Sequence, residues 1–163
     1  SAALCLTEEL RLLVDGEDAK LVSENTYELM SYLAGLNEQG KLKPVKKRQA
    51  GSYAYHTPCH LAALKSKPAG AELVRNLTGA DVMEINAGCC GLSGTFGMQK
   101  KNYDLSLEIG RSMADEINAA DAGQAMTECA ACKMQIEHLT GKITVHPIKV
   151  LAAAYGISEK FQF

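Results

Sequence analysis

The sequence predicts an α/β fold in which helices flank a four-stranded parallel sheet, preceded by a helical lead-in. From residue 50 onward, short β-prone segments alternate with segments whose apolar residues recur at helical spacing. Cysteine or histidine residues directly follow or end each β-prone segment. Strands that alternate with helices form parallel sheets with right-handed crossovers, so the carboxyl ends of all four strands would meet at one edge.

The first 48 residues are expected to lie outside this sheet. Leucines at positions 10, 13, 29, 33 and 36 recur at helical spacing and predict helical structure over residues 1–40, with a cap region at residues 23–25. Residues 41–48 contain five basic residues and a proline, which favours an exposed linker. We therefore divide the chain into a helical lead-in with a basic linker, residues 1–48, and a main domain, residues 49–163.

Within the main domain the elements follow in regular order. Strands are predicted at residues 52–56, 81–85, 124–127 and 143–145. Helices are predicted at residues 69–78, 100–120 and 130–139, and from Pro147 to Tyr155, where proline suits a first helical turn. The longest helix has apolar residues four apart, at positions 105, 109, 113 and 117. This order predicts a Rossmann-like sheet.

Composition and charge exclude several classes of protein. Of the 163 residues, 47% are hydrophobic and 22% are charged, which is ordinary for a globular domain with a real core. A formal net charge of −2 argues against nucleic acid as a partner. There is no apolar run long enough for a membrane span and no visible signal peptide, so we expect a cytoplasmic protein. Because the chain begins at Ser1, we expect a piece of a longer protein.

The cysteines indicate the chemistry. Five of the six follow the first three predicted strands: Cys59, Cys89, Cys90, Cys129 and Cys132. In a reducing compartment such a group indicates metal or redox chemistry rather than structural disulfides. Tetrahedral zinc and a cubane cluster each use four protein ligands, so five thiols exceed both. Two adjacent cysteines suit the binding of neighbouring metals in a polynuclear cluster. They also suit an arrangement in which one of them is a ligand and the other is a spare thiol.

Glycines and histidines surround the predicted cysteine site. The glycines at positions 88, 91, 94 and 97 would let the backbone approach a bulky group closely, and helices that begin after the loops would direct positive dipole ends toward it. Three histidines lie near the strand ends: His56, His60 and His146. They could be ligands, hydrogen-bond donors to sulfur or structural residues. We favour roles outside direct coordination, because the thiols already saturate a metal.

These residues resemble the CCG, or cysteine-rich, domain family. The resemblance covers the chain from about residue 52 to its end and rests on residues 56–60 (HTPCH), 90–97 (CGLSGTFG), 102–104 (NYD), 132–137 (CKMQIE) and 146–148 (HPI). The family occurs, usually in two copies, in iron–sulfur subunits of heterodisulfide reductase and of glycerol-3-phosphate, glycolate and D-lactate dehydrogenases. The glycerol-3-phosphate and FAD-linked D-lactate types resemble this sequence most.

The resemblance implies a C-terminal copy, preceded in the full-length protein by a ferredoxin-like segment and a first copy. Residues 1–48 would then close that first copy, and Cys5 would be a relic of its Cys-x-x-Cys motif. In heterodisulfide reductase the five motif cysteines hold a non-cubane [4Fe-4S] cluster, which implies the same cofactor on the five cysteines here. Some family copies hold zinc instead, so zinc is the alternative metal.

Three functions remain open. The first is an electron-transfer module that passes electrons from a flavin dehydrogenase, with FAD on a partner chain or domain, toward quinone or another acceptor. The second is a zinc-stabilised structural or docking domain. The third is thiol–disulfide chemistry at Cys129 and Cys132 or at Cys89 and Cys90. We favour the first, because the sequence lies nearest the flavin-linked relatives. Any association with a membrane would come through partners.

Overall fold

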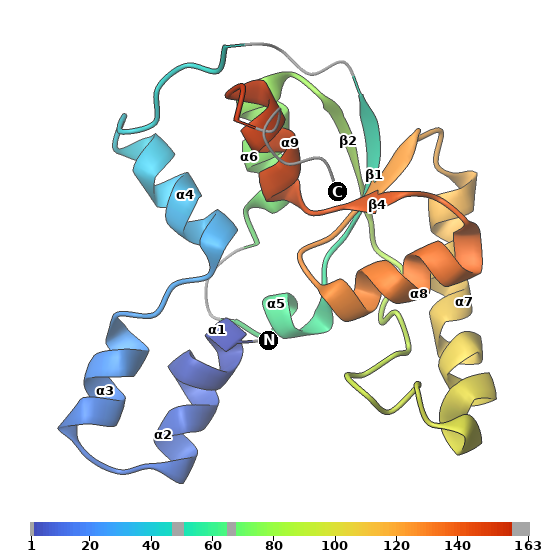
Figure 1. Cartoon of the computed structure of the whole chain (residues 1–163), viewed down its shortest axis with the longest axis horizontal. Coiled ribbons are helices and arrows are strands. Elements are labelled where there is room, and N and C mark those ends of the chain that lie inside the picture. Colours follow the sequence, from blue (N-terminus) through green and yellow to red (C-terminus); the bar gives the residue numbers. More distant parts are fainter. Residues whose placement is uncertain (1, 47–50, 65–67, 158–163) are drawn as a thin grey trace.

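The computed structural model describes residues 2–46, 51–64 and 68–157, and a four-stranded parallel sheet forms its centre (Figure 1). The strands are β1 (Ser52–His56), β2 (Asp81–Ile85), β3 (Gln124–Met126) and β4 (Thr144–Val145), in the order β2-β1-β3-β4. Every neighbouring pair is parallel. The predicted fold class is confirmed, although the third and fourth strands are each one residue shorter than predicted.

Helices cover both faces of the sheet. On one face lie α6 (Gly70–Thr78) and α9 (Pro147–Ala154), which pack against each other, and on the other lie α7 (Tyr103–Ala119) and α8 (Ala130–Thr140). The long helix begins three residues later than predicted, because a 3₁₀ turn, η2 (Lys100–Asn102), precedes it. A single helical turn, α5 (Cys59–Ala62), follows β1 and was not predicted.

Alternation along the central strands divides the core into two apolar clusters. Tyr55 and Met126 point toward α6 and α9, where they pack with Val74, Leu151 and their neighbours. Ala54 and Ala125 point the other way, into a cluster that also contains Cys90 and Cys132. Successive strand residues face opposite sides of a sheet, so this division follows from the strand period of two. Two of the cysteines therefore belong to the core on the side of α7 and α8.

The N-terminal residues are helical, as predicted, but form several short elements. These are α1 (Ala2–Leu4), a π-helical turn η1 (Cys5–Glu9), α2 (Leu10–Leu13), α3 (Glu17–Glu24) and α4 (Leu29–Glu38). Gly16, with φ of 122°, separates α2 from α3. The predicted cap region at residues 23–25 is the carboxyl end of α3, with Asn25 as its C-cap. The N-cap of α4 is Glu28, whose carboxylate accepts from the N–H groups of Met30 and Ser31.

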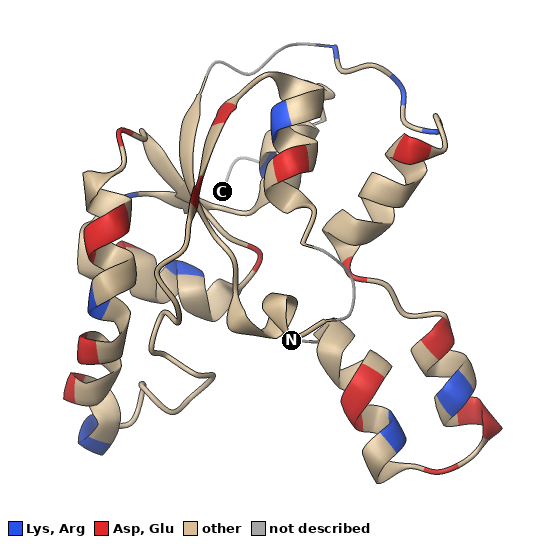
Figure 2. Cartoon of the chain, turned by 180° about the vertical axis from the view of Figure 1, so that it is seen from behind, with Lys and Arg blue, Asp and Glu red and all other residues tan. Residues whose placement is uncertain are grey.

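The segment after α4 joins this region to the sheet domain. Its described residues contact the carboxyl end of α9: the Lys46 N–H donates to the Ala154 carbonyl at 3.0 Å, and the Tyr155 hydroxyl donates to the Lys43 carbonyl at 2.8 Å. Lysines line this segment, whereas some helices, such as α7, carry both acidic and basic residues (Figure 2). Residues 47–50 of the predicted linker lie outside the described residues. Among the described helices, none has the length and apolar character needed to cross a bilayer.

Candidate metal centre

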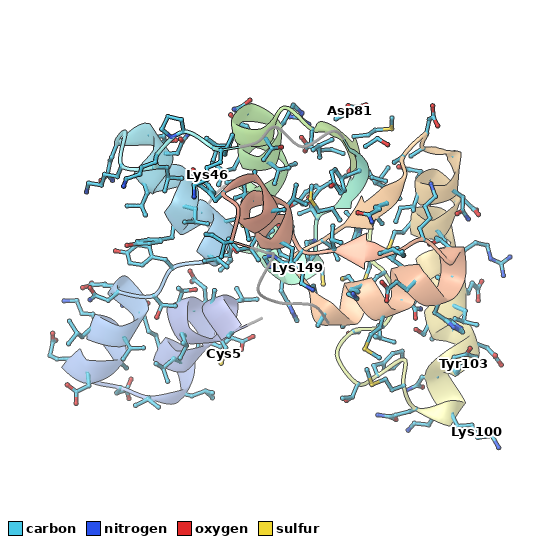
Figure 3. All side chains as sticks on the ribbon, turned by 45° about the horizontal axis from the view of Figure 1, so that its top comes forward. Cys5, Lys46, Asp81, Lys100, Tyr103 and Lys149 are labelled. Carbon is cyan, nitrogen blue, oxygen red and sulfur yellow. The ribbon has the colours of Figure 1, made fainter. Side chains whose placement is uncertain are left out.

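Five cysteines occupy the loops and helix starts that follow the first three strands. Cys59 begins α5 directly after β1, and Cys89 and Cys90 lie in the loop that follows β2. Cys129 is the N-cap of α8, and Cys132 lies in the first turn of that helix. The sixth cysteine, Cys5, lies instead in the N-terminal helices (Figure 3). The topology thus brings three separate segments of sequence to one edge of the sheet.

The five thiols form a continuous chain of contacts. Cys132 is hydrogen-bonded to both Cys129 and Cys90. Cys90 is in turn hydrogen-bonded to its neighbour Cys89, which contacts Cys59. In the described part of the chain, no three His, Cys, Asp or Glu side chains converge in the manner of a single-metal site. The thiols are therefore neighbours in a row rather than ligands aimed at one point.

Two of these thiols already favour the thiolate. The pKa of Cys129 is lowered to about 5, because Cys132 and the backbone N–H groups of Cys132 and Ala131 hydrogen-bond to its sulfur. The pKa of Cys90 is lowered to about 6, chiefly through its hydrogen bond with Cys132. Cys132 is the donor in both contacts, so its own pKa is raised. Thiolates are the form in which cysteine binds metals.

The remaining two thiols are more accessible. Burial raises the pKa of Cys89, although the Gly91 N–H donates to its sulfur at 3.3 Å. Cys59 is exposed, whereas Cys90 and Cys132 are each only 3% exposed. The middle of the row, Cys132 and Cys90, therefore lies in the core, and the row reaches the surface at Cys59.

Tight packing against α7 positions the loop that contains Cys89 and Cys90. A side chain at Gly91 would collide with the Ser106 carbonyl, and one at Gly97 would collide with the Ser106 hydroxyl. A Cβ at Gly110 of α7 would lie 2.5 Å from the Cys90 carbonyl oxygen. The sequence predicted that the loop glycines leave room for a bulky group beside the thiols. Those at 91 and 97 leave room for α7 instead, and at 88 and 94 an added Cβ would meet nothing within 4 Å.

Among the residues that the structure describes, one helix longer than a single turn begins directly at the thiols. The sequence predicted helix starts after each cysteine loop, but the chain after Cys90 makes turns up to η2 before α7 begins. The α8 N-terminus at Cys129 is the start that fits the prediction, and its free N–H groups account for part of the low Cys129 pKa. A buried hydrogen bond ties α8 to α7, because the Gln135 amide donates to the Ser106 hydroxyl at 3.1 Å.

The three histidines have different surroundings. His146 is the N-cap of α9: its Nδ1 accepts from the Ile148 N–H at 3.1 Å, and burial lowers its pKa. His60 lines a cavity beside Cys129. His56, at the end of β1, is 1% exposed; burial lowers its pKa, so it is neutral, and its Nε2 has no hydrogen-bond partner.

Unpartnered polar atoms gather at this edge of the sheet. Within the described ranges, three buried side-chain atoms lack a partner: His56 Nε2, Thr127 Oγ1 and Glu128 Oε2. All three follow or end the two central strands, β1 and β3. The Glu128 carboxyl lies on the side of Tyr55 and α6, whereas His56 and Thr127 alternate onto the side of Cys90 and Cys132. Buried polar groups in proteins are nearly always hydrogen-bonded, so His56 Nε2 and Thr127 Oγ1 are suited to bind a further group beside the thiols.

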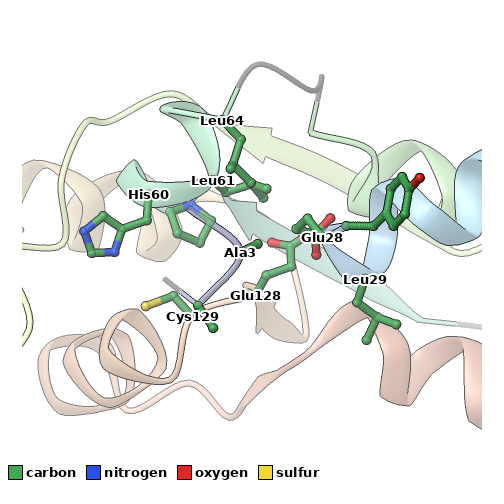
Figure 4. Close-up of a pocket in the computed structure, with 11 residues that line it drawn as sticks. Ala3, Glu28, Leu29, His60, Leu61, Leu64, Glu128 and Cys129 are labelled. Carbon is green, nitrogen blue, oxygen red and sulfur yellow. The ribbon is translucent and has the colours of Figure 1, made fainter. Parts of the chain in front are cut away.

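A cavity of about 250 Å³ opens beside Cys129, between the N-terminal helices and the sheet domain (Figure 4). Glu128 lines it, and Oε1 of its carboxyl group accepts from the Tyr55 hydroxyl at 2.8 Å. Burial, together with the nearby charge of Glu28, raises the pKa of Glu128 to about 7. The sequence pattern carried no signal for Glu128 or Thr127, because their burial depends on contacts between distant segments.

Comparison with known proteins gives a consistent result. Residues 53–137 match the family described as the cysteine-rich domain, CCG. A subunit of the anaerobic glycerol-3-phosphate dehydrogenase from Escherichia coli K12 is 37% identical over 117 residues, 72% of this chain and 29% of that protein. Lactate utilization protein A from Geobacillus sp. WCH70 is 32% identical over 151 residues, 87% of this chain and 58% of that protein.

A third relative is an uncharacterized iron–sulfur protein of Methanocaldococcus jannaschii, which is 31% identical over 116 residues, 69% of this chain and 22% of that protein. The chain thus matches less than a third of the length of two of these relatives and 58% of the other.

Proposed function

Because the chain belongs to the cysteine-rich (CCG) domain family, we propose that it is an iron–sulfur electron-transfer module of a dehydrogenase. The observation that supports this most is the continuous row of five thiols, which lies beside buried polar atoms that lack partners. Relatives that are named as a dehydrogenase subunit and as an iron–sulfur protein support the same class of function.

The proposed ligands are the five thiols of this row: Cys59, Cys89, Cys90, Cys129 and Cys132. A row of five suits several neighbouring metals better than one tetrahedral ion, and we therefore propose a [4Fe-4S] cluster, of non-cubane type, rather than zinc. When bound, such a cluster supplies one-electron redox chemistry. Cys129 and Cys90 would bind as the thiolates that their surroundings already favour, and Cys132 would give up its proton on binding.

The residues around the row of thiols would control the access of water to the cluster and the reduction potential of the cluster. Cys90 and Cys132, in the middle of the row, lie in the core, which keeps water from that part of the site, whereas the exposed Cys59 end would face the electron partner. We propose that this partner is a flavin dehydrogenase subunit or domain that holds FAD and oxidises glycerol 3-phosphate or a D-2-hydroxyacid, with quinone as an acceptor. A cytoplasmic location is proposed with it, since all six cysteines are free.

The N-terminal residues fit a place within a longer protein. We propose that residues 1–48 form the end of a preceding copy of the family, itself preceded by a ferredoxin-like segment. Support comes from the leucine side chains of α2, since Leu12 is 84% and Leu13 81% exposed, and apolar side chains exposed together are typical of contact surfaces.

The test compares two cysteine variants purified without oxygen. Cys90→Ser should abolish the visible absorption and EPR signal of the cluster while circular dichroism shows a folded domain, because a buried thiolate ligand is lost. The matched control, Cys5→Ser, should keep both spectra, since Cys5 lies in the N-terminal helices and not in the strand-end segments that contain the row. A wild-type spectrum in Cys90→Ser would remove Cys90 from the ligand set, and loss of the cluster in Cys5→Ser would contradict its exclusion.

A second candidate function is thiol–disulfide chemistry, which the pKa pattern of Cys129 and Cys132 favours. A Cys-x-x-Cys pair at a helix N-terminus, with one low-pKa thiol, is typical of dithiol oxidoreductases. Metal-free, reduced protein that exchanges rapidly with a disulfide reagent, and loses this activity in Cys129→Ser, would support this function. Unchanged exchange in Cys129→Ser would contradict it.

A further inference from the structure

His56 and Thr127 form a pair of buried polar side chains without partners on one face of the sheet. The last paired residues of β1 and β3 in the ladder are Tyr55 and Met126, so His56 and Thr127 are the next neighbours across the two strands. The ladder continues on the β4 side, where the Thr127 N–H donates to the Val145 carbonyl at 3.0 Å. His56 is 1% exposed and Thr127 is 2% exposed.

The side that this pair faces follows from the strand period. Ala54 and Ala125, two residues earlier on each strand, pack in the cluster that contains Cys90 and Cys132. Side chains two residues apart on a strand share a face. The imidazole of His56 and the hydroxyl of Thr127 therefore face the half of the thiol row that is buried.

The pair differs from the other buried polar side chains of the described residues. Each of the others has a hydrogen bond, and this set comprises Thr78, Ser106, Gln135 and Thr144. A buried hydroxyl or imidazole without a partner destabilises the folded protein, because the group has lost its hydrogen bonds to water. Two of them side by side, next to the thiols, indicate that both hydrogen bonds are made to the group bound there.

We propose that Thr127 and His56 are positioning residues that donate O–H and Nε2–H hydrogen bonds to the sulfur atoms of the bound cluster and raise its reduction potential. The inference rests on the proposed function. Hydrogen bonds to cluster sulfurs stabilise the more negative, reduced state and so raise the potential. An imidazole ring has at least one N–H to donate, and the threonine hydroxyl has one O–H.

The test combines a potential with a stability measured on the metal-free protein. Thr127→Val removes the hydroxyl at nearly constant shape. We expect it to lower the midpoint potential of the loaded protein and to raise the unfolding midpoint of the metal-free protein, because an unsatisfied buried hydroxyl disappears. Thr127→Ser keeps the donor and should restore the wild-type potential. His56→Leu should lower the potential further when combined with Thr127→Val.

The matched control is Thr78→Val on α6. Thr78 is fully buried, but its hydroxyl donates to the Val74 carbonyl at 2.8 Å. This variant should leave the potential unchanged and lower the unfolding midpoint, the opposite sign to Thr127→Val. The inference alone is overturned if Thr127→Val and His56→Leu both have the midpoint potential of the wild type. It is also overturned if Thr127→Val lowers the unfolding midpoint of the metal-free protein as much as Thr78→Val does. A wild-type protein that takes up no iron or sulfide overturns the proposed function, and the inference with it.

Discussion

Replacing Gly110 by alanine should separate α7 from the cysteine loop. Gly110 is buried in the middle of α7, and a Cβ there would lie 2.5 Å from the Cys90 carbonyl oxygen and 3.0 Å from Cδ1 of Leu139. The leucine can turn away, but the carbonyl belongs to the backbone. Ordinary contacts begin near 3.4 Å, so the Cys90 backbone would have to move by about 0.9 Å.

The size of the effect follows from two opposing contributions. Alanine is favoured over glycine inside a helix by about 1 kcal/mol. Overpacking of a core costs about 1–3 kcal/mol. We therefore expect Gly110→Ala to lower the free energy of unfolding by up to about 2 kcal/mol, although it improves the helix propensity. Because the displaced backbone belongs to Cys90, iron bound per chain should fall as well.

The assay is urea unfolding of reduced, metal-free protein, followed by iron analysis after anaerobic reconstitution. The matched control is Gly35→Ala in α4, where an added Cβ would meet no atom within 4 Å. This control should gain up to about 1 kcal/mol of stability and bind iron as the wild type does. If Gly110→Ala were as stable as Gly35→Ala and bound iron normally, the packing of α7 against Cys90 would not position the site.

Two further substitutions probe the polar contacts near the thiols. Glu128→Gln should match the stability of the wild type near pH 4 and exceed it by up to about 3 kcal/mol at pH 8. The pKa of Glu128 rises from 4.5 in the unfolded chain to about 7 in the folded protein, so ionisation of the buried carboxyl destabilises the fold as pH increases. If urea unfolding gives a difference in free energy between the two proteins that does not change with pH, this prediction is contradicted. Gln135→Leu should lower the free energy of unfolding by about 1–2 kcal/mol, because it removes both hydrogen bonds from Gln135 to Ser106. The control Lys133→Leu, on the exposed side of the same helix, should change the free energy of thermal unfolding by less than about 0.5 kcal/mol. Equal effects of the two substitutions would refute the prediction.

The helices and strands could be predicted because the residues that indicate each of them lie close together in the sequence. The strand at residues 81–85 and the helix α7 are both confirmed. Their patterns only partly match the buried faces, because Val82 and Ile85 pack in different clusters and only the second half of the four-residue repeat in α7 is buried. Pro147 marks the start of α9 correctly. The placement of cysteines after strands also predicts their meeting at one edge, because parallel strands share a direction.

The details that hold the site depend on contacts between distant segments. The hydrogen bond from Tyr55 to Glu128 spans 73 residues, and the contact of Gly110 with Cys90 joins a helix to a loop without regular structure. No periodicity marks Thr127 as buried, since it follows a strand of only three residues. Likewise, the breaks between α2, α3 and α4 depend on Gly16 and on the Glu28 cap rather than on the leucine pattern.

The composition of the bound group tests the central proposal most directly. The chain is purified without oxygen, and iron, zinc and acid-labile sulfide are measured per chain together with the EPR spectrum. An iron–sulfur electron-transfer module on five thiolates predicts about four irons and four sulfides per chain. One tightly bound zinc per chain without sulfide would contradict it and favour a structural or docking domain.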